Sequence, residues 1–129
     1  MGYGMTVRVE AAFADAVERT RSALQDQGFG VLTEIDVQAT LQEKLGEQVE
    51  PYLILGACNP PLAHRALEAD RQVGLLLPCN VVVRADGEGA LVEALDPHVM
   101  SRVAGHDRLD AVAAEARERL QAALETLRA

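Results

Sequence analysis

The chain has 129 residues, 49% of them hydrophobic and 25% charged, and its 12 basic and 20 acidic residues give a net charge of -8. This composition predicts one globular domain over residues 1–129 and excludes a disordered chain, which has too few apolar residues to form a core. With only 3% aromatic residues and an acidic charge, the chain is not expected to bind nucleic acid, which requires neutralised phosphates.

The sequence also predicts where the protein works. No run reaches the roughly 18 apolar residues that span a bilayer, and the first residues lack the basic and apolar regions of a signal peptide. We therefore expect no membrane association and a cytoplasmic location. The two cysteines are too few for a disulfide framework and are expected to be reduced there.

The first third of the chain reads as a strand, a helix and a second strand. Residues 6–10 alternate apolar and polar side chains, which is typical of a half-buried strand. From Ala12 the apolar residues recur at helical spacing, and Gly28 is placed to end that helix in a left-handed conformation. Residues 29–35 then form a second predicted strand.

A short helix is predicted next, capped by Asp36 and ended by Gly46. Its buried side is expected to be the apolar stripe Val37, Leu41 and Leu45. The continuous apolar run 52–58 predicts a central strand. Asn59 then caps a helix that runs to Asp70, with an inward stripe of Leu62, Ala63, Ala66 and Leu67.

The second half predicts a hairpin and a long helix. Residues 79–84 and 90–95 are strand-like and are joined through Asp86-Gly87, and Asp96-Pro97 ends the pair. Asp107 is expected to cap a helix that keeps one apolar face for about 33 Å. Because a hairpin comes late in the chain and regular βαβ units are missing, the order of elements favours an α+β fold with a mostly antiparallel sheet.

The two Cys-Asn dipeptides are the most unusual feature of the sequence. Cys58-Asn59 stands at the end of one predicted apolar strand and Cys79-Asn80 at the start of another, so their side chains are candidates to line a pocket. Buried cysteines that act as small apolar residues are the ordinary explanation. The alternatives are a redox or nucleophilic thiol pair, and a metal site with His64 as a third ligand.

Other polar residues are weaker candidates. His98 and His106 lie in a predicted polar turn and are expected to be solvated. Asp36 and Lys44 lie eight residues apart on one predicted helix, where a helix cap and a solvated lysine explain them. The functional alternative places both in a cleft beside the cysteines.

Four motifs, in order along the chain, resemble a bacterial and archaeal family known as domain of unknown function 302: FGVLTEID from Phe29, LQEKLG from Leu41, PYLILGACNP from Pro51 and GLLLPCNVVV from Gly74. The resemblance implies a fold similar to the TATA-binding-protein class, with a curved antiparallel sheet, helices on one side and a homodimeric assembly. It implies no activity. It does not imply DNA binding, which the charge opposes.

We therefore expect a homodimer that binds a small ligand or ion in a cleft near Asp36, Lys44, Cys58, Asn59, Cys79 and Asn80. A thiol-dependent redox or transfer enzyme that uses Cys58 and Cys79 is the first alternative. The second is a protein-interaction module that presents the apolar stripe of the C-terminal helix to a partner.

Overall fold

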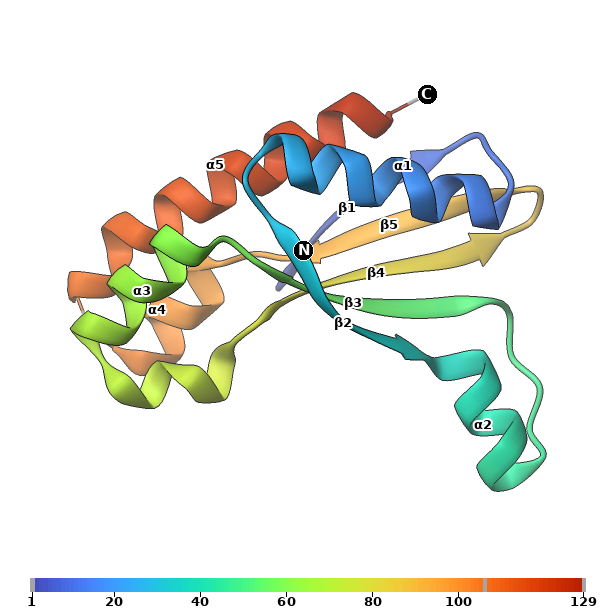
Figure 1. Ribbon diagram of the computed structural model, residues 1–129, viewed down its shortest axis with the longest axis horizontal. Coiled ribbons are helices and arrows are strands. Elements are labelled where there is room, and N and C mark those ends of the chain that lie inside the picture. The colour runs from blue at the N-terminus through green and yellow to red at the C-terminus, as the bar shows by residue number, and fades with distance from the viewer. Residues whose placement is uncertain (1, 106, 129) are drawn as a thin grey trace.

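The structure, a computed structural model, describes residues 2–105 and 107–128. In this part of the chain one antiparallel sheet has the strand order β1-β5-β4-β3-β2 (Figure 1). Its strands are β1 (Gly4–Val9), β2 (Gly30–Asp36), β3 (Tyr52–Cys58), β4 (Cys79–Asp86) and β5 (Gly89–Leu95). The predicted hairpin is formed by β4 and β5. β3, predicted as a central strand, is an interior strand between β2 and β4, and the middle strand of the sheet is β4.

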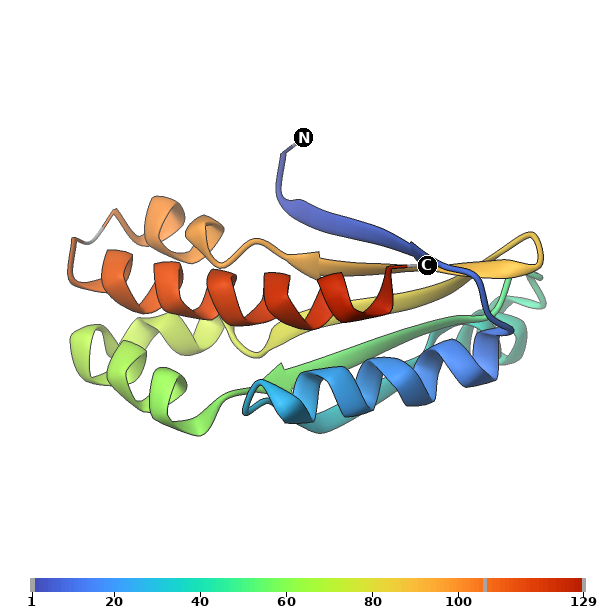
Figure 2. The same cartoon turned by 90° about the horizontal axis from the view of Figure 1, so that it is seen from above.

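The helices lie on one side of this sheet. They are α1 (Phe13–Asp26), α2 (Val37–Leu45), α3 (Pro60–Ala69), α4 (His98–Ala104) and α5 (Asp110–Leu127), with the 3-10 turns η1 (Arg71–Leu76) and η2 (Asp107–Leu109). Figures 1 and 2 show α1 and α5 side by side over the sheet, whereas α2 projects beyond the end of β2. The predicted α+β class, with a strand-helix-strand start, an antiparallel sheet, helices on one side and a long C-terminal helix, is confirmed.

Local signals in the sequence explain several element boundaries. Asp36 accepts a hydrogen bond from the Ala39 amide at 2.9 Å and so begins α2, as predicted. Gly46 and Gly28 follow α2 and α1 with φ angles of +68° and +84°, a region that favours glycine. Asn59 begins α3 by accepting a hydrogen bond from the Leu62 amide at 3.3 Å.

The main core lies between the sheet and the helices α1 and α5. Alternate residues of the strands, such as Val7 and Val9, face this core and are buried, as their alternation predicts. They pack with the inner sides of α1 and of the C-terminal half of α5. The apolar stripe of this half of α5 is thus covered by the chain's own core.

A second apolar cluster lies beyond one end of the sheet. It is formed by α3, η1, α4, η2 and the N-terminal half of α5, and its buried residues are Leu62, Ala66, Val73, Met100, Leu109, Val112, Ala113 and Ala116. Because α5 contributes to both clusters, it connects the second cluster to the main core. The whole apolar face of α5 is therefore buried, and the structure does not support a role for it as a surface for partners.

Three expectations about the helices are wrong. No residue of α2 is buried, and Leu45 is 68% exposed, because α2 projects from the body instead of packing on it. A polar turn was predicted around His98, but this residue begins the helix α4. His106 lies outside the described residues. Asp107 does not cap α5. It begins the turn η2, and α5 starts at Asp110 without a side-chain cap.

Candidate functional site

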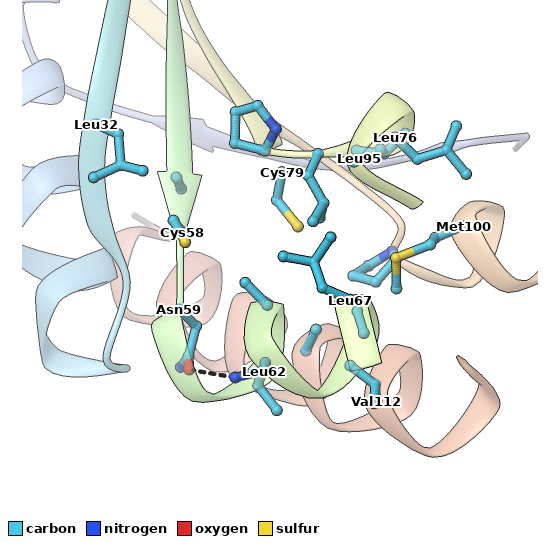
Figure 3. A pocket seen from close by; sticks show the side chains of 18 of the residues that line it. Leu32, Cys58, Asn59, Leu62, Leu67, Leu76, Cys79, Leu95, Met100 and Val112 are labelled. Carbon is cyan, nitrogen blue, oxygen red and sulfur yellow. Dashed lines mark hydrogen bonds between the residues drawn. The ribbon is translucent and has the colours of Figure 1, made fainter. Parts of the chain in front are cut away.

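A cavity of about 390 Å³ lies at the end of the sheet, between the main core and the second cluster. It is located where β3 ends at Cys58 and β4 begins at Cys79, so that the intervening α3 and η1 form a wall (Figure 3). Small-molecule sites in proteins have volumes of about 300–1,000 Å³ and are mostly apolar. This cavity is therefore large enough to hold a small ligand.

The lining is almost entirely apolar. From the strands and their ends it takes Leu32, Thr33, Ala57, Cys58, Asn59, Pro78, Cys79 and Leu95. From the helices and turns it takes Leu62, Ala63, Ala66, Leu67, Gly74, Leu76, Leu77, Pro97, Met100, Val112 and Ala116. None of these described lining residues has an ionisable side chain other than the two thiols.

A bulge in β2 places Leu32 at the edge of the cavity. Val31 pairs with Ala57 and Thr33 pairs with Gly56, so Leu32 has no partner in β3. Its side chain is 69% exposed and also borders the cavity. Leu32 therefore lies at the mouth, where the cavity opens to solvent.

Gly56 of β3 allows Thr33 of β2 and Pro78, which precedes β4, to approach β3 closely at this end of the sheet. A side chain on Gly56 would overlap the hydroxyl of Thr33 and would lie 2.9 Å from Cγ of Pro78. Only glycine leaves room for both neighbours, each of which lines the cavity. Gly56 thus helps to shape the site without lining it.

The amide side chain of Asn59 is committed to the fold. Its Oδ1 accepts from Leu62, and its Nδ2 donates to the carbonyl oxygen of Gln27 at 3.4 Å. The residue is 7% exposed, and it fixes both the start of α3 and its distance from the end of α1. Asn59 therefore borders the cavity mainly as a structural residue.

The two thiols border the same cavity but leave the sheet in different directions. Cys79 pairs with Ala57 and so shares its face, whereas Cys58 follows Ala57 and is directed to the other face. Figure 3 shows the Cys79 sulfur directed into the space between β3 and Leu67. Both cysteines are free thiols.

Burial and, to a smaller extent, the nearby Cys58 together raise the pKa of Cys79 from 9.0 to about 11. A thiol with such a pKa stays protonated at neutral pH, while thiol catalysts need a lowered pKa. The structure therefore does not support the thiol-dependent redox or transfer enzyme, since one of its two thiols is held in the unreactive form.

Asp96, which precedes the lining residue Pro97, holds two helices of the second cluster together. Its carboxylate accepts from the His98 amide at 3.0 Å and from Nε of Arg117 at 3.2 Å, and so connects the start of α4 to α5. Burial raises the pKa of Asp96, but these donors and the charge of Arg117 outweigh it and hold the pKa below 3.8. Asp96 is thus an ionised structural residue.

The structure does not gather the six predicted site residues in one cleft, and that prediction needs correction. Only Cys58, Asn59 and Cys79 border the cavity. Asp36 caps α2 at the far end of β2, six residues from Gly30, the partner of Cys58. At about 3.3 Å per residue the separation is about 20 Å.

The remaining predicted polar residues also lie apart from the cavity. Lys44 is on the exposed helix α2. Asn80 is exposed beside Gly56, its pairing partner in β3. The side chain of His64 is 71% exposed and lies 3.7 Å from Glu68, so the structure does not bring the proposed third metal ligand to the thiols.

Sequence reasoning missed most of the lining because it followed polar residues. The inward stripe Leu62, Ala63, Ala66 and Leu67 was predicted, and all four border the cavity. Met100 and Val112 lie on elements whose packing the sequence did not reveal. The small residues Ala63, Ala66, Gly74 and Ala116 were the feature of the sequence that could have indicated an unfilled space between the elements.

These features define a class of protein, a small α+β domain with an open antiparallel sheet and an apolar cavity where the sheet meets a second cluster of helices. The model of the family described as domain of unknown function DUF302 matches residues 5–127. A crystal structure of an uncharacterized conserved DUF302 protein from Bacillus stearothermophilus is similar, with 32% sequence identity and a TM-score of 0.92. The alignment covers 99% of this chain and 100% of that one.

The chain therefore belongs to the DUF302 family, as its four motifs indicated. No function is assigned by these relationships, and no curated protein matches the chain. Among the described residues, no helix is long and apolar enough to cross a membrane.

Proposed function

We propose that the protein binds a small ligand in the cavity between its two apolar clusters. The observation that carries the proposal is the volume of about 390 Å³ with an apolar lining and a mouth at Leu32. A void of this size between packed elements forgoes van der Waals contacts that larger side chains would supply. Binding a ligand there would restore those contacts, which gives the cavity a role that packing alone does not.

An uncharged fluorescent dye small enough for this volume, 1-naphthylamine, tests the proposal. We expect its emission to shift to shorter wavelength on binding to the native protein, and we expect Ala63→Leu, which places a larger side chain in the cavity, to weaken binding at least tenfold. Ala14→Leu is the matched control, because Ala14 is an exposed helical residue outside the lining. Equal dye binding by the wild type and both variants would contradict the proposal.

We further propose that two copies associate through the edge formed by β2 and α2, which makes the protein a homodimer. β2 is an edge strand with exposed backbone groups, a feature that proteins usually cover or interrupt. Ile35 on β2 is 51% exposed, and Leu45 on α2 is 68% exposed. Two antiparallel copies of one strand present the same surface to each other, as a two-fold interface requires.

The mass in solution tests the dimer. We expect sedimentation equilibrium to give twice 13.9 kDa, about 28 kDa, and we expect Ile35→Lys to shift the mass toward that of the monomer. Leu75→Lys is the control, because Leu75 is 79% exposed on η1 and belongs to neither β2 nor α2. A wild-type mass of 13.9 kDa at 100 µM protein would refute this assembly.

A cytoplasmic location is part of the same proposal. Its support is that both cysteines are free and one is held as a neutral, buried thiol, which suits a reducing compartment. Fractionation of cells that produce the tagged chain tests it, and recovery of the protein in the membrane or exported fraction would contradict it.

A further inference from the structure

The cavity offers no charged group to a ligand. The described lining residues include no Asp, Glu, Lys, Arg or His. An ionised carboxylate or ammonium group that enters such a site loses its hydration and gains no ion pair, which is strongly unfavourable. The chain's net charge of -8 adds a further repulsion for anions at the mouth.

The polar atoms of the lining are also largely committed. Asn59 uses both ends of its amide within the fold. The hydroxyl of Thr33 lies against Gly56. Within the described residues, no buried side-chain nitrogen or oxygen lacks a hydrogen-bond partner. Apart from the hydroxyl of the exposed Thr33 and the two thiols, the described lining therefore offers no polar side-chain atom to a ligand.

The thiol of Cys79 is a polar group directed into the space, as Figure 3 shows. Burial keeps its pKa near 11 and therefore keeps it neutral. A neutral thiol is a weak donor and a weak acceptor. It suits an apolar ligand with a single small neutral group, such as an alcohol, better than it suits an ion.

The volume limits the size of such a ligand. If each non-hydrogen atom takes about the 30 Å³ that a water molecule occupies in the liquid, 390 Å³ holds about a dozen atoms. An unbranched chain of about ten carbons with one oxygen meets this limit. The lining of aliphatic side chains, with no aromatic ring among the described residues, favours aliphatic ligands over stacked aromatic ones.

We propose that the ligand of this cavity is an uncharged aliphatic molecule of about a dozen non-hydrogen atoms, and that the site discriminates against the corresponding carboxylate and ammonium compounds. This inference rests on the proposed function and specifies its ligand class. Compounds with the same hydrophobic chain bury the same apolar surface, so the chain alone does not discriminate between them. The discrimination comes from the described lining, which has no charged side chain to pair with a charged head group.

Three compounds with the same ten-carbon chain test the inference, namely decan-1-ol, decanoate and decylammonium. Each is titrated at pH 7.5 against the protein loaded with the naphthylamine dye, and only displacement that Ala63→Leu weakens is counted as binding in the cavity. This restriction removes the attraction of a cation to the acidic surface. Ala14→Leu again serves as the matched control.

We expect decan-1-ol to displace the dye with an affinity at least tenfold higher than that of either charged compound. If decanoate or decylammonium binds as tightly as the alcohol, the ligand class is wrong while the cavity remains a binding site. If the dye binds but none of the three displaces it, the aliphatic class is again wrong. If the dye itself does not bind, the proposed function fails and the inference fails with it.

Discussion

Cys79 is expected to react with an alkylating reagent far more slowly than an ordinary cysteine, because only the thiolate attacks. Burial raises its pKa from 9.0 to about 11. At pH 8 the thiolate fraction then falls from roughly one in ten to roughly one in a thousand, so the rate should fall about a hundred-fold. The magnitude follows from the protonation equilibrium alone, and limited access to the buried sulfur slows the reaction further.

Iodoacetamide rates on the Cys58→Ser variant, in which Cys79 is the sole cysteine, measure this effect. The same variant unfolded in urea gives the reference rate at each pH. We expect the logarithm of the native rate to rise with a slope of one from pH 7 to 9.5, because burial, the larger cause of the raised pKa, persists in this variant. A rate that levels off near pH 9, or lies within tenfold of the unfolded reference, would refute the reasoning.

The same group links stability to pH. Because folding raises the pKa of Cys79, the neutral thiol stabilises the folded state. This stabilisation is fully present below pH 9 and is lost as the pH rises toward 11. The difference between the two pKa values corresponds to about 2–3 kcal/mol. In urea unfolding the wild type should therefore lose stability over this range relative to Cys79→Ala, and parallel curves for the two proteins would count against the raised pKa.

Three further substitutions, with Leu75→Ala as a fourth that serves as control, test the packing around the site by urea unfolding. Gly56→Ala should cost about 1–3 kcal/mol, because the new Cβ would lie 2.9 Å from the ring of Pro78, and an unchanged midpoint would contradict the close approach. Leu55→Ala, at a fully buried position, should cost about 2–5 kcal/mol, whereas exposed Leu75→Ala should change stability by no more than about 0.5 kcal/mol. Asp96→Ala should cost about 0.5–2 kcal/mol at pH 7, because two hydrogen bonds to the carboxylate are lost. Since folding lowers the pKa of this carboxyl, the cost should shrink as the pH falls below 3.8, and a cost independent of pH would argue against an ionised Asp96.

The sequence predicted the sheet and most helices because their signals are local. The alternation around Val7 and the hairpin turn at Asp86-Gly87 each act within a few residues. The caps at Asp36 and Asn59 act within one helical turn. These features require no knowledge of which elements pack together, and the structure confirms each of them.

The errors arose where burial depends on distant elements. The stripe of α2 resembles a buried face, but the direction of β2 carries α2 away from both apolar clusters, so Leu45 is exposed. The predicted cleft failed for a related reason. Asp36 and Cys58 lie close to opposite ends of the β2–β3 pair, and a sequence with one short helix between two strands does not reveal which strand ends meet.

The cavity itself illustrates a balance between stability and binding. Small side chains, among them Ala63 and Ala116, border it where larger ones would fill the space between the two clusters. Because the gain from filling an open cavity comes from new apolar contacts, Ala63→Leu should stabilise the fold by about 1–2 kcal/mol in urea unfolding while it weakens dye binding at least tenfold. Ala14→Leu should do neither. Destabilisation of more than about 1 kcal/mol by Ala63→Leu would show that the space is already closed in solution, since overpacking then outweighs the new contacts.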